Sequence, residues 1–131
     1  MKIAEDSPLF AENSRIVVEP EALTGRVRLE NVGRSQGTPS YRGKLELVKG
    51  EEGILVINEV LLEEYLYAVV PSEMPSSYPL EALKSQAICA RTYAYDKMCH
   101  AGLARYGAHV DDSSAFQVYN NIEENADTQG Q

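Results

Sequence analysis

At residues 70–75 the chain reads Val70-Pro71-Ser72-Glu73-Met74-Pro75, which places a carboxylate between two prolines. Each proline fixes its own φ angle and biases the residue before it toward extended geometry. The run therefore predicts a stiff loop that presents Glu73, rather than a helix interior or a central strand. Burial of Glu73 beside Met74 and the prolines would favour its protonated form, which a general acid needs. A helix-capping or surface glutamate is the alternative interpretation.

Helices are expected on both sides of this run. Before it, apolar residues recur from Leu62 to Val69 with i, i+3, i+4, i+7 spacing, which predicts a short helix. After it, Pro79 suits the first turn of a longer, alanine-rich helix, and Gly102 suits its end. An apolar stripe along this second helix is expected to pack on a sheet; it comprises Leu80, Leu83, Ala87, Ala90, Ala94 and Met98.

The first half of the chain predicts strands. Short apolar or alternating runs, separated by turn formers, lie at residues 15–18, 26–30, 44–48 and 54–57. Residues 49–53 are expected to form a hairpin loop, and residues 31–40 a loop that could border a site. The predicted fold class is α+β, with N-terminal antiparallel strands packed on the long helix. Residues 1–14 are expected to be an irregular leader, 15–122 one domain and 123–131 a polar, acidic tail.

Composition limits the classes of partner. The 131 residues carry a net charge of −8, which argues against nucleic acid and against an anionic membrane surface. No run approaches the ~18 apolar residues that a membrane span requires, so no transmembrane segment is expected in this chain. The N-terminal residues show no signal-peptide hydrophobic region.

The two cysteines lie ten residues apart, at Cys89 and Cys99, on the longer predicted helix. A continuous helix would separate them by about 15 Å, whereas a disulfide needs Cα atoms within about 7 Å. They are therefore not expected to pair with each other. We expect Cys89 to be buried as a small hydrophobic residue.

Several ordered blocks closely resemble the core of the stage II sporulation protein D family, also called the SpoIID/LytB or amidase-enhancer domain. The blocks are residues 41–43, 58–75, 79–94, 106–110 and 117–119, and the resemblance covers roughly residues 34–119. By this resemblance the domain at 15–122 is SpoIID/LytB-like and incomplete, because the family's C-terminal strands are missing. A sheet edge left exposed in this way could pair with a second copy, which would give a homo-oligomer.

The resemblance implies a function. Sporulation members of the family are lytic transglycosylases acting on peptidoglycan, and their proposed catalytic acid corresponds to Glu73. Such an enzyme cleaves the MurNAc-GlcNAc bond during engulfment and leaves 1,6-anhydro-MurNAc ends, with one carboxylate as acid and then base. A hydrolase would need a second carboxylate, for which Asp111 or Asp112 is the best candidate, although this pair is more typical of a turn.

A different function is open from the same resemblance. The chain could be a non-catalytic amidase enhancer, a module that binds the cell wall and stimulates a partner amidase. Either function implies the extracellular or cell-surface side of the bacterial membrane, and peptidoglycan glycan strands as the partner.

Four polar residues in the matching blocks are candidate substrate-binding residues. Gln86 and Arg91 lie five residues apart on the longer helix, so only one is expected to face a cleft. Arg91 could equally form a structural ion pair. Gln117 and Tyr119 would share one face of a strand and could line a groove, where the Tyr119 ring could stack on a sugar.

Metal and cofactor binding are not expected. Some clostridial family members carry a zinc site of His and Cys residues after the main helix. Here His109 precedes Asp111 and Asp112, but Phe116 stands where a cysteine ligand would be expected. Zinc requires converging ligands, so His109 is expected instead to form hydrogen bonds near the cleft.

Overall fold

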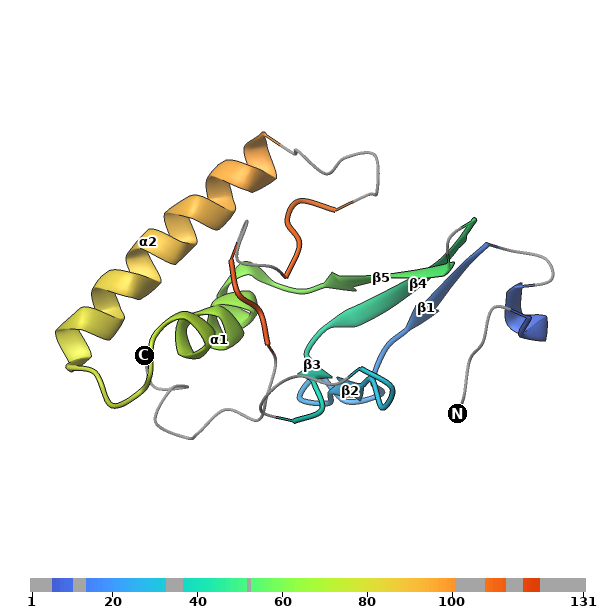
Figure 1. The fold of residues 1–131 in the computed structure, drawn as a ribbon, viewed down its shortest axis with the longest axis horizontal. Coiled ribbons are helices and arrows are strands. Elements are labelled where there is room, and N and C mark those ends of the chain that lie inside the picture. The colour runs from blue at the N-terminus through green and yellow to red at the C-terminus, as the bar shows by residue number, and fades with distance from the viewer. Residues whose placement is uncertain are drawn as a thin grey trace. The chain divides into compact units, whose positions relative to one another are not determined.

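The fold is α+β, as predicted, with short strands followed by two helices (Figure 1). The computed structural model describes residues 6–10, 14–32, 37–51, 53–100, 108–112 and 117–120. Their elements are η1 (Pro8–Phe10), β1 (Arg15–Val18), β2 (Val27–Arg28), β3 (Ser40–Tyr41), β4 (Lys44–Gly50), β5 (Gly53–Glu59), α1 (Leu62–Glu73) and α2 (Leu80–Cys99). The chain divides into two compact units, one of residues 1–27 and 41–60 and the other of residues 28–40 and 61–131.

The first unit contains a three-stranded antiparallel sheet in the order β1-β4-β5, seen side by side in Figure 1. The pairing register places Leu47 of β4 opposite Ile16 of β1 and Val56 of β5, so one face of the sheet carries an apolar row. The three longer strands confirm the predictions, while the strand expected at 26–30 is reduced to β2. Pairing of an edge strand with a second copy stays a prediction.

The β4–β5 hairpin is tighter than predicted. Gly50 lies directly opposite Gly53, so both strands extend into the expected loop at 49–53. Gly53 has a φ of 139°, a conformation that favours glycine and permits the abrupt reversal.

The described parts of the leader and of the loop at 31–40 show local order. Phe10 at the end of η1 is buried, and η1 contacts β1. The predicted loop lies between β2 and β3, which pair as a two-stranded sheet, and the Leu29 N–H donates to the Pro39 carbonyl at 3.3 Å. Residues 33–36 of this loop lie outside the described residues.

The second unit contains α1 and α2, which pack against each other. The middle of the predicted stripe on α2 is buried at Leu83, Ala90 and Ala94, but its ends at Leu80 and Met98 are exposed. Helix α1 has 12 residues and α2 has 20, so α1 is too short to cover the whole stripe. Among the described helices, none has the length and apolar character of a membrane span.

The proline-flanked run is not a loop, contrary to the prediction. Helix α1 continues through Pro71 to Glu73, its last residue. Pro71 cannot donate a helical hydrogen bond, but the next turn is maintained by the Met74 N–H, which donates to the Val70 carbonyl at 2.9 Å. Met74 is extended, with φ −141° and ψ 125°, as expected for a residue before proline. Pro75, and not Pro71, therefore ends the helix.

Helix α2 begins directly after Pro79, whose carbonyl accepts hydrogen bonds from the N–H groups of Ala82 and Leu83. It ends at Cys99, and Gly102 lies outside the described residues. Cys89 and Cys99 are both free, as expected for one continuous helix. The predicted burial of Cys89 is wrong: it is exposed, because it points about 100° away from the buried Ala90 that follows it.

Replacing Gly43 by alanine should destabilise the first unit. Gly43 has a φ of +74°, and an added Cβ would collide with the Glu59 carbonyl oxygen. We expect Gly43→Ala to lower the free energy of unfolding, measured in urea, by roughly 2–4 kcal/mol, since strain and overlap add. Gly50→Ala is the control, because its Cβ would meet the Gly53 oxygen at an ordinary 3.5 Å. Equal effects of the two substitutions would contradict this prediction.

Candidate active site

Glu73 is exposed at the C-terminal end of α1, and the predicted burial of its side chain is wrong. Its orientation is set by a hydrogen bond instead, because the backbone N–H of Val118 donates to Oε1 at 2.8 Å. The carboxylate therefore meets the negative end of the helix dipole and a partly positive N–H group at the same time. The result is a solvent-accessible carboxylate with one oxygen held in place.

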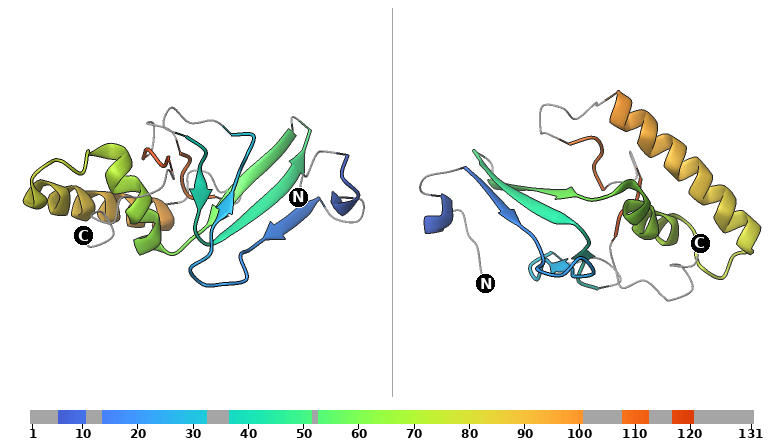
Figure 2. Two further views of the ribbon diagram at one scale, coloured as in Figure 1. Left: turned by 90° about the horizontal axis from the view of Figure 1, so that it is seen from below. Right: turned by 180° about the vertical axis from the view of Figure 1, so that it is seen from behind.

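A second hydrogen bond joins the same two parts of the chain. The Asn120 N–H donates to Ser72 Oγ at 3.1 Å, and the Ser72 hydroxyl itself donates to the Ala68 carbonyl at 2.5 Å. We call residues 117–120 the docked segment; Figure 2 shows it beside α1 from two further sides. The strand predicted at 115–119 is wrong for its described residues, because these backbone N–H groups bind side chains of α1 rather than a neighbouring strand.

Gln117 and Tyr119 anchor the docked segment on the helices. Gln117 is only 6% exposed; its Oε1 accepts a hydrogen bond from the Tyr65 hydroxyl at 3.0 Å, and its Nε2 donates to the Ala90 carbonyl at 3.2 Å. The Tyr119 ring packs on the Tyr65 ring with centroids 4.9 Å apart. The two side chains share one side of the segment, as predicted, but they face inward. A role in substrate binding stays a prediction for both, and Tyr119, 7% exposed, offers no open ring face.

The hydroxyl of Tyr65 lies at the centre of the site. Burial raises its pKa far above the ordinary value, and the nearby groups of Tyr93, Glu73 and Asp111 raise that pKa further. The carboxylates of Glu73 and Asp111 therefore both influence the pKa of the buried Tyr65 hydroxyl. Of the two acidic candidates in the predicted turn, Asp111 is thus placed within electrostatic range of this cluster.

Arg91 forms an ion pair, the second of its two predicted roles. Its Nε and one terminal nitrogen donate to the two carboxylate oxygens of Glu63 at 2.7 and 2.9 Å. The hydrogen bond from Arg91 lowers the pKa of Glu63, and that from Glu63 raises the pKa of Arg91. The pair ties α2 to the first turn of α1, and a substrate contact by Arg91 stays a prediction.

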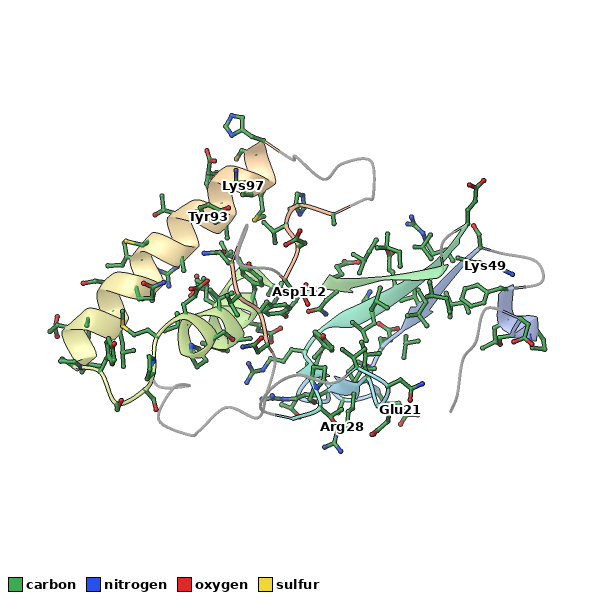
Figure 3. All side chains as sticks on the ribbon, viewed as in Figure 1. Glu21, Arg28, Lys49, Tyr93, Lys97 and Asp112 are labelled. Carbon is green, nitrogen blue, oxygen red and sulfur yellow. The ribbon has the colours of Figure 1, made fainter. Side chains whose placement is uncertain are left out.

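Gln86 is half-buried and lies on the other side of the α2 stripe from Arg91. It is seven residues from Tyr93, so the two lie on the same edge of the helix. Tyr93 is covered by Lys97, whose Nζ lies 5.3 Å from the ring centroid (Figure 3). A substrate contact by Gln86 stays a prediction.

Metal binding finds no support in the described residues. Within them, no group of three His, Cys, Asp or Glu side chains is arranged to hold a metal ion. His109 is described and exposed, whereas Phe116 lies outside the described part of the chain.

Ser72, Tyr65 and the N–H of Val118 were missed by the sequence reasoning. The helical spacing from Leu62 to Val69 marks Tyr65 only as an apolar position, and a backbone N–H has no sequence signature. The run Gln117-Val118-Tyr119 holds a usable signal for the Val118 N–H. In an extended chain the side chains of Gln117 and Tyr119 point to one side, and the N–H of Val118 points in a different direction.

The Stage II sporulation protein family, SpoIID, matches residues 50–131 of this chain. The match covers more than half of the 131 residues, so the chain belongs to the SpoIID family. It includes both helices, Glu73 and the docked segment.

Three relatives show the extent of the similarity. Stage II sporulation protein D of Bacillus subtilis (strain 168) is 46% identical over 65 residues, which are 48% of this chain and 19% of that relative. The Amidase enhancer of the same organism is 44% identical over 63 residues, 48% of this chain and 8% of its own length. An uncharacterized protein of Brachyspira hyodysenteriae is 39% identical over 84 residues, which are 63% of this chain and 22% of that relative. The chain thus spans less than a quarter of these relatives. No solved structure matches it.

Removing the Tyr65 hydroxyl should destabilise the second unit. Tyr65→Phe leaves the buried Gln117 oxygen without its donor, so we expect the free energy of unfolding in urea to fall by about 1–3 kcal/mol. Tyr78→Phe is the control, because Tyr78 is 50% exposed. In a double-mutant cycle with Gln117→Met the two losses should not add. Additive losses would contradict the proposed hydrogen bond.

The Glu63–Arg91 pair should give a small stabilisation that depends on pH. Because the folded pKa of Glu63 is lowered, the stabilisation is present above the ordinary value of 4.5 and is lost as pH falls through the lowered value. Both partners are largely exposed, so Glu63→Gln should cost less than about 1 kcal/mol at neutral pH. The cost should vanish once the pH lies below the lowered pKa of Glu63, where its carboxyl group is protonated in both the folded and the unfolded chain. Glu64→Gln, in the same helical turn, is the control for the dipole effect; an equal pH dependence in both variants would contradict this assignment.

Proposed function

We propose that this chain is the catalytic part of a peptidoglycan lytic transglycosylase that acts in sporulation-associated remodelling of the cell wall during engulfment. The carrying observation is Glu73 itself: its carboxylate is accessible to a bulky substrate, yet one of its oxygens is held by the Val118 N–H. Membership of the SpoIID family supports the cell-wall context. Because peptidoglycan lies outside the cytoplasmic membrane, the proposed location is the extracellular or cell-surface side.

One carboxyl group is sufficient for the proposed reaction. Protonated Glu73 gives its proton to the glycosidic oxygen between MurNAc and GlcNAc as the C1–O bond breaks. The resulting carboxylate then takes the proton of the MurNAc C6 hydroxyl while that oxygen attacks C1. The products are a 1,6-anhydro-MurNAc end and a free GlcNAc 4-hydroxyl, and Glu73 is protonated again. No water is consumed.

A hydrolytic outcome would use a second carboxylate, Asp111 or Asp112. A second carboxylate could activate water and give a reducing MurNAc end instead of the anhydro sugar. Asp111 and Asp112 are the candidates for this part, and the charge of Asp111, like that of Glu73, raises the pKa of the Tyr65 hydroxyl. The chemical form of the MurNAc end therefore distinguishes the two mechanisms.

A second candidate function is non-catalytic. A relative that is 44% identical carries the name Amidase enhancer. In this alternative the chain binds the wall and stimulates a partner amidase. The outer side of α2 supports it weakly, because Ile88 and Tyr95 are each 60% exposed there and could contact a partner.

Substitution of Glu73 by glutamine tests the proposed function. We expect Glu73→Gln to lower the release of anhydro-muropeptides from purified glycan strands by at least about 100-fold, because glutamine cannot transfer the proton. Mass spectrometry identifies the products from strands with and without stem peptides. Glu81→Gln removes an exposed carboxylate from the first turn of α2 and should leave the activity unchanged.

Three outcomes would contradict the transglycosylase proposal. Reducing MurNAc ends would indicate hydrolysis, and equal activity of Glu73→Gln and the unsubstituted chain would exclude Glu73 as the acid. If no glycan is cut while amidase turnover rises equally with both versions, the enhancer function replaces the proposal.

A further inference from the structure

We propose that Ser72 is a positioning residue for Glu73, and that Ser72 and Glu73 together clamp the docked segment so that one defined oxygen of Glu73 reacts. This inference rests on the proposed function. The geometry that supports it is a pair of adjacent acceptors on α1 and a pair of donors two residues apart, Val118 and Asn120.

The spacing of the donors explains why both bonds can form together. In an extended chain, the N–H groups of residues i and i+2 point to the same side. The side chains of Gln117 and Tyr119 are buried: Gln117 bonds to Tyr65 and Ala90, and the Tyr119 ring packs on Tyr65. The docked segment is thus held by its side chains in the core and by its N–H groups at the end of α1.

The Val118 N–H distinguishes the two oxygens of Glu73. Oε1 accepts a hydrogen bond from an amide that can donate but cannot accept, so the proton of the acid form belongs on Oε2. Oε1 can keep the same hydrogen bond in the charged form. The geometry therefore assigns both proton transfers to Oε2, and the carboxyl group need not rotate between them.

Ser72 acts through the segment rather than on the substrate. Its hydroxyl uses its proton on the Ala68 carbonyl and a lone pair on the Asn120 N–H. The bond to Ala68 holds the Ser72 hydroxyl on α1, and the bond from Asn120 then holds the docked segment to that hydroxyl. Without the hydroxyl, the position of Val118 depends on its own N–H bond to Glu73 and on the buried side chains of Gln117 and Tyr119, and the orientation of Glu73 becomes less defined.

The test compares Ser72→Ala with Ser72→Thr and with Ser85→Ala. Threonine keeps the hydroxyl. Ser85 is the matched control on α2, because its hydroxyl also donates to the carbonyl four residues earlier, that of Glu81, at 2.8 Å. We expect Ser72→Ala to lower kcat by about 10- to 100-fold with little change in KM, because misorientation affects the reacting geometry more than binding. Ser72→Thr should retain most of the activity, and Ser85→Ala all of it.

A readout other than activity is the hydrogen exchange of the Val118 and Asn120 amides, measured by NMR on the whole chain. In Ser72→Ala both amides should exchange at least about 5-fold faster, since a hydrogen bond that holds the docked segment closed is lost. Glu73→Gln should keep the protection of Val118, because the glutamine oxygen can still accept, whereas Glu73→Ala should lose it. Replacement of the Val118 amide by an ester should lower kcat as Ser72→Ala does.

The clamp would be overturned by unchanged exchange at Val118 in Ser72→Ala, or by equal activity of Ser72→Ala and Ser85→Ala. Failure of the proposed function is a separate result. An unsubstituted chain that cuts no glycan would overturn the enzymatic role, and with it the assignment of Oε2, even if both amides show the expected protection.

Discussion

The hydrogen bond from the Val118 N–H to Glu73 is the interaction on which the site depends. It joins the last residue of α1 to a segment 45 positions later in the chain, and a parallel bond from Asn120 to Ser72 repeats the connection one residue earlier on the helix. Neither bond would exist if α1 ended earlier. Pro75 forces Met74 into an extended conformation and so makes Glu73 the last helical residue. A local constraint of one proline thus decides where the carboxylate is presented.

The supports behind this contact are neutral and buried. Tyr65, Gln117 and the Ala90 carbonyl form a chain of hydrogen bonds in which each polar atom has a partner. Such a chain is costly to break, because a buried group without a partner loses its hydration and gains nothing in return. The charged contacts lie further out, and the Glu63–Arg91 pair is largely exposed. Orientation in this unit comes from neutral hydrogen bonds more than from ion pairs.

Much of the architecture was predictable because it depends on local patterns. Alternation and turn residues located β1, β4 and β5, and helical spacing located α1 and α2. Pro71 misled the prediction, since a proline near the end of a helix costs only one hydrogen bond and packing of the neighbouring Val69 and Val70 outweighs it. Glu73 was found through the motif, but its exposure was not, because burial depends on which distant segment covers the residue. The roles of Ser72 and Tyr65 depend on partners 48 and 52 residues away, which no local pattern encodes.

The long sequence separation of these contacts has a consequence for synthesis and folding. Domains emerge from the ribosome N-terminus first, so the helix that ends in Glu73 is complete before residues 117–120 are made. Until then the Glu73 carboxylate has no orienting amide, and the geometry proposed for catalysis is absent although the residue is present. Partial opening would have a similar effect. Release of residues 117–120 alone would remove the amide that orients Glu73 while both helices stay folded. The orientation of Glu73 therefore depends on residues 117–120, which are made after both helices.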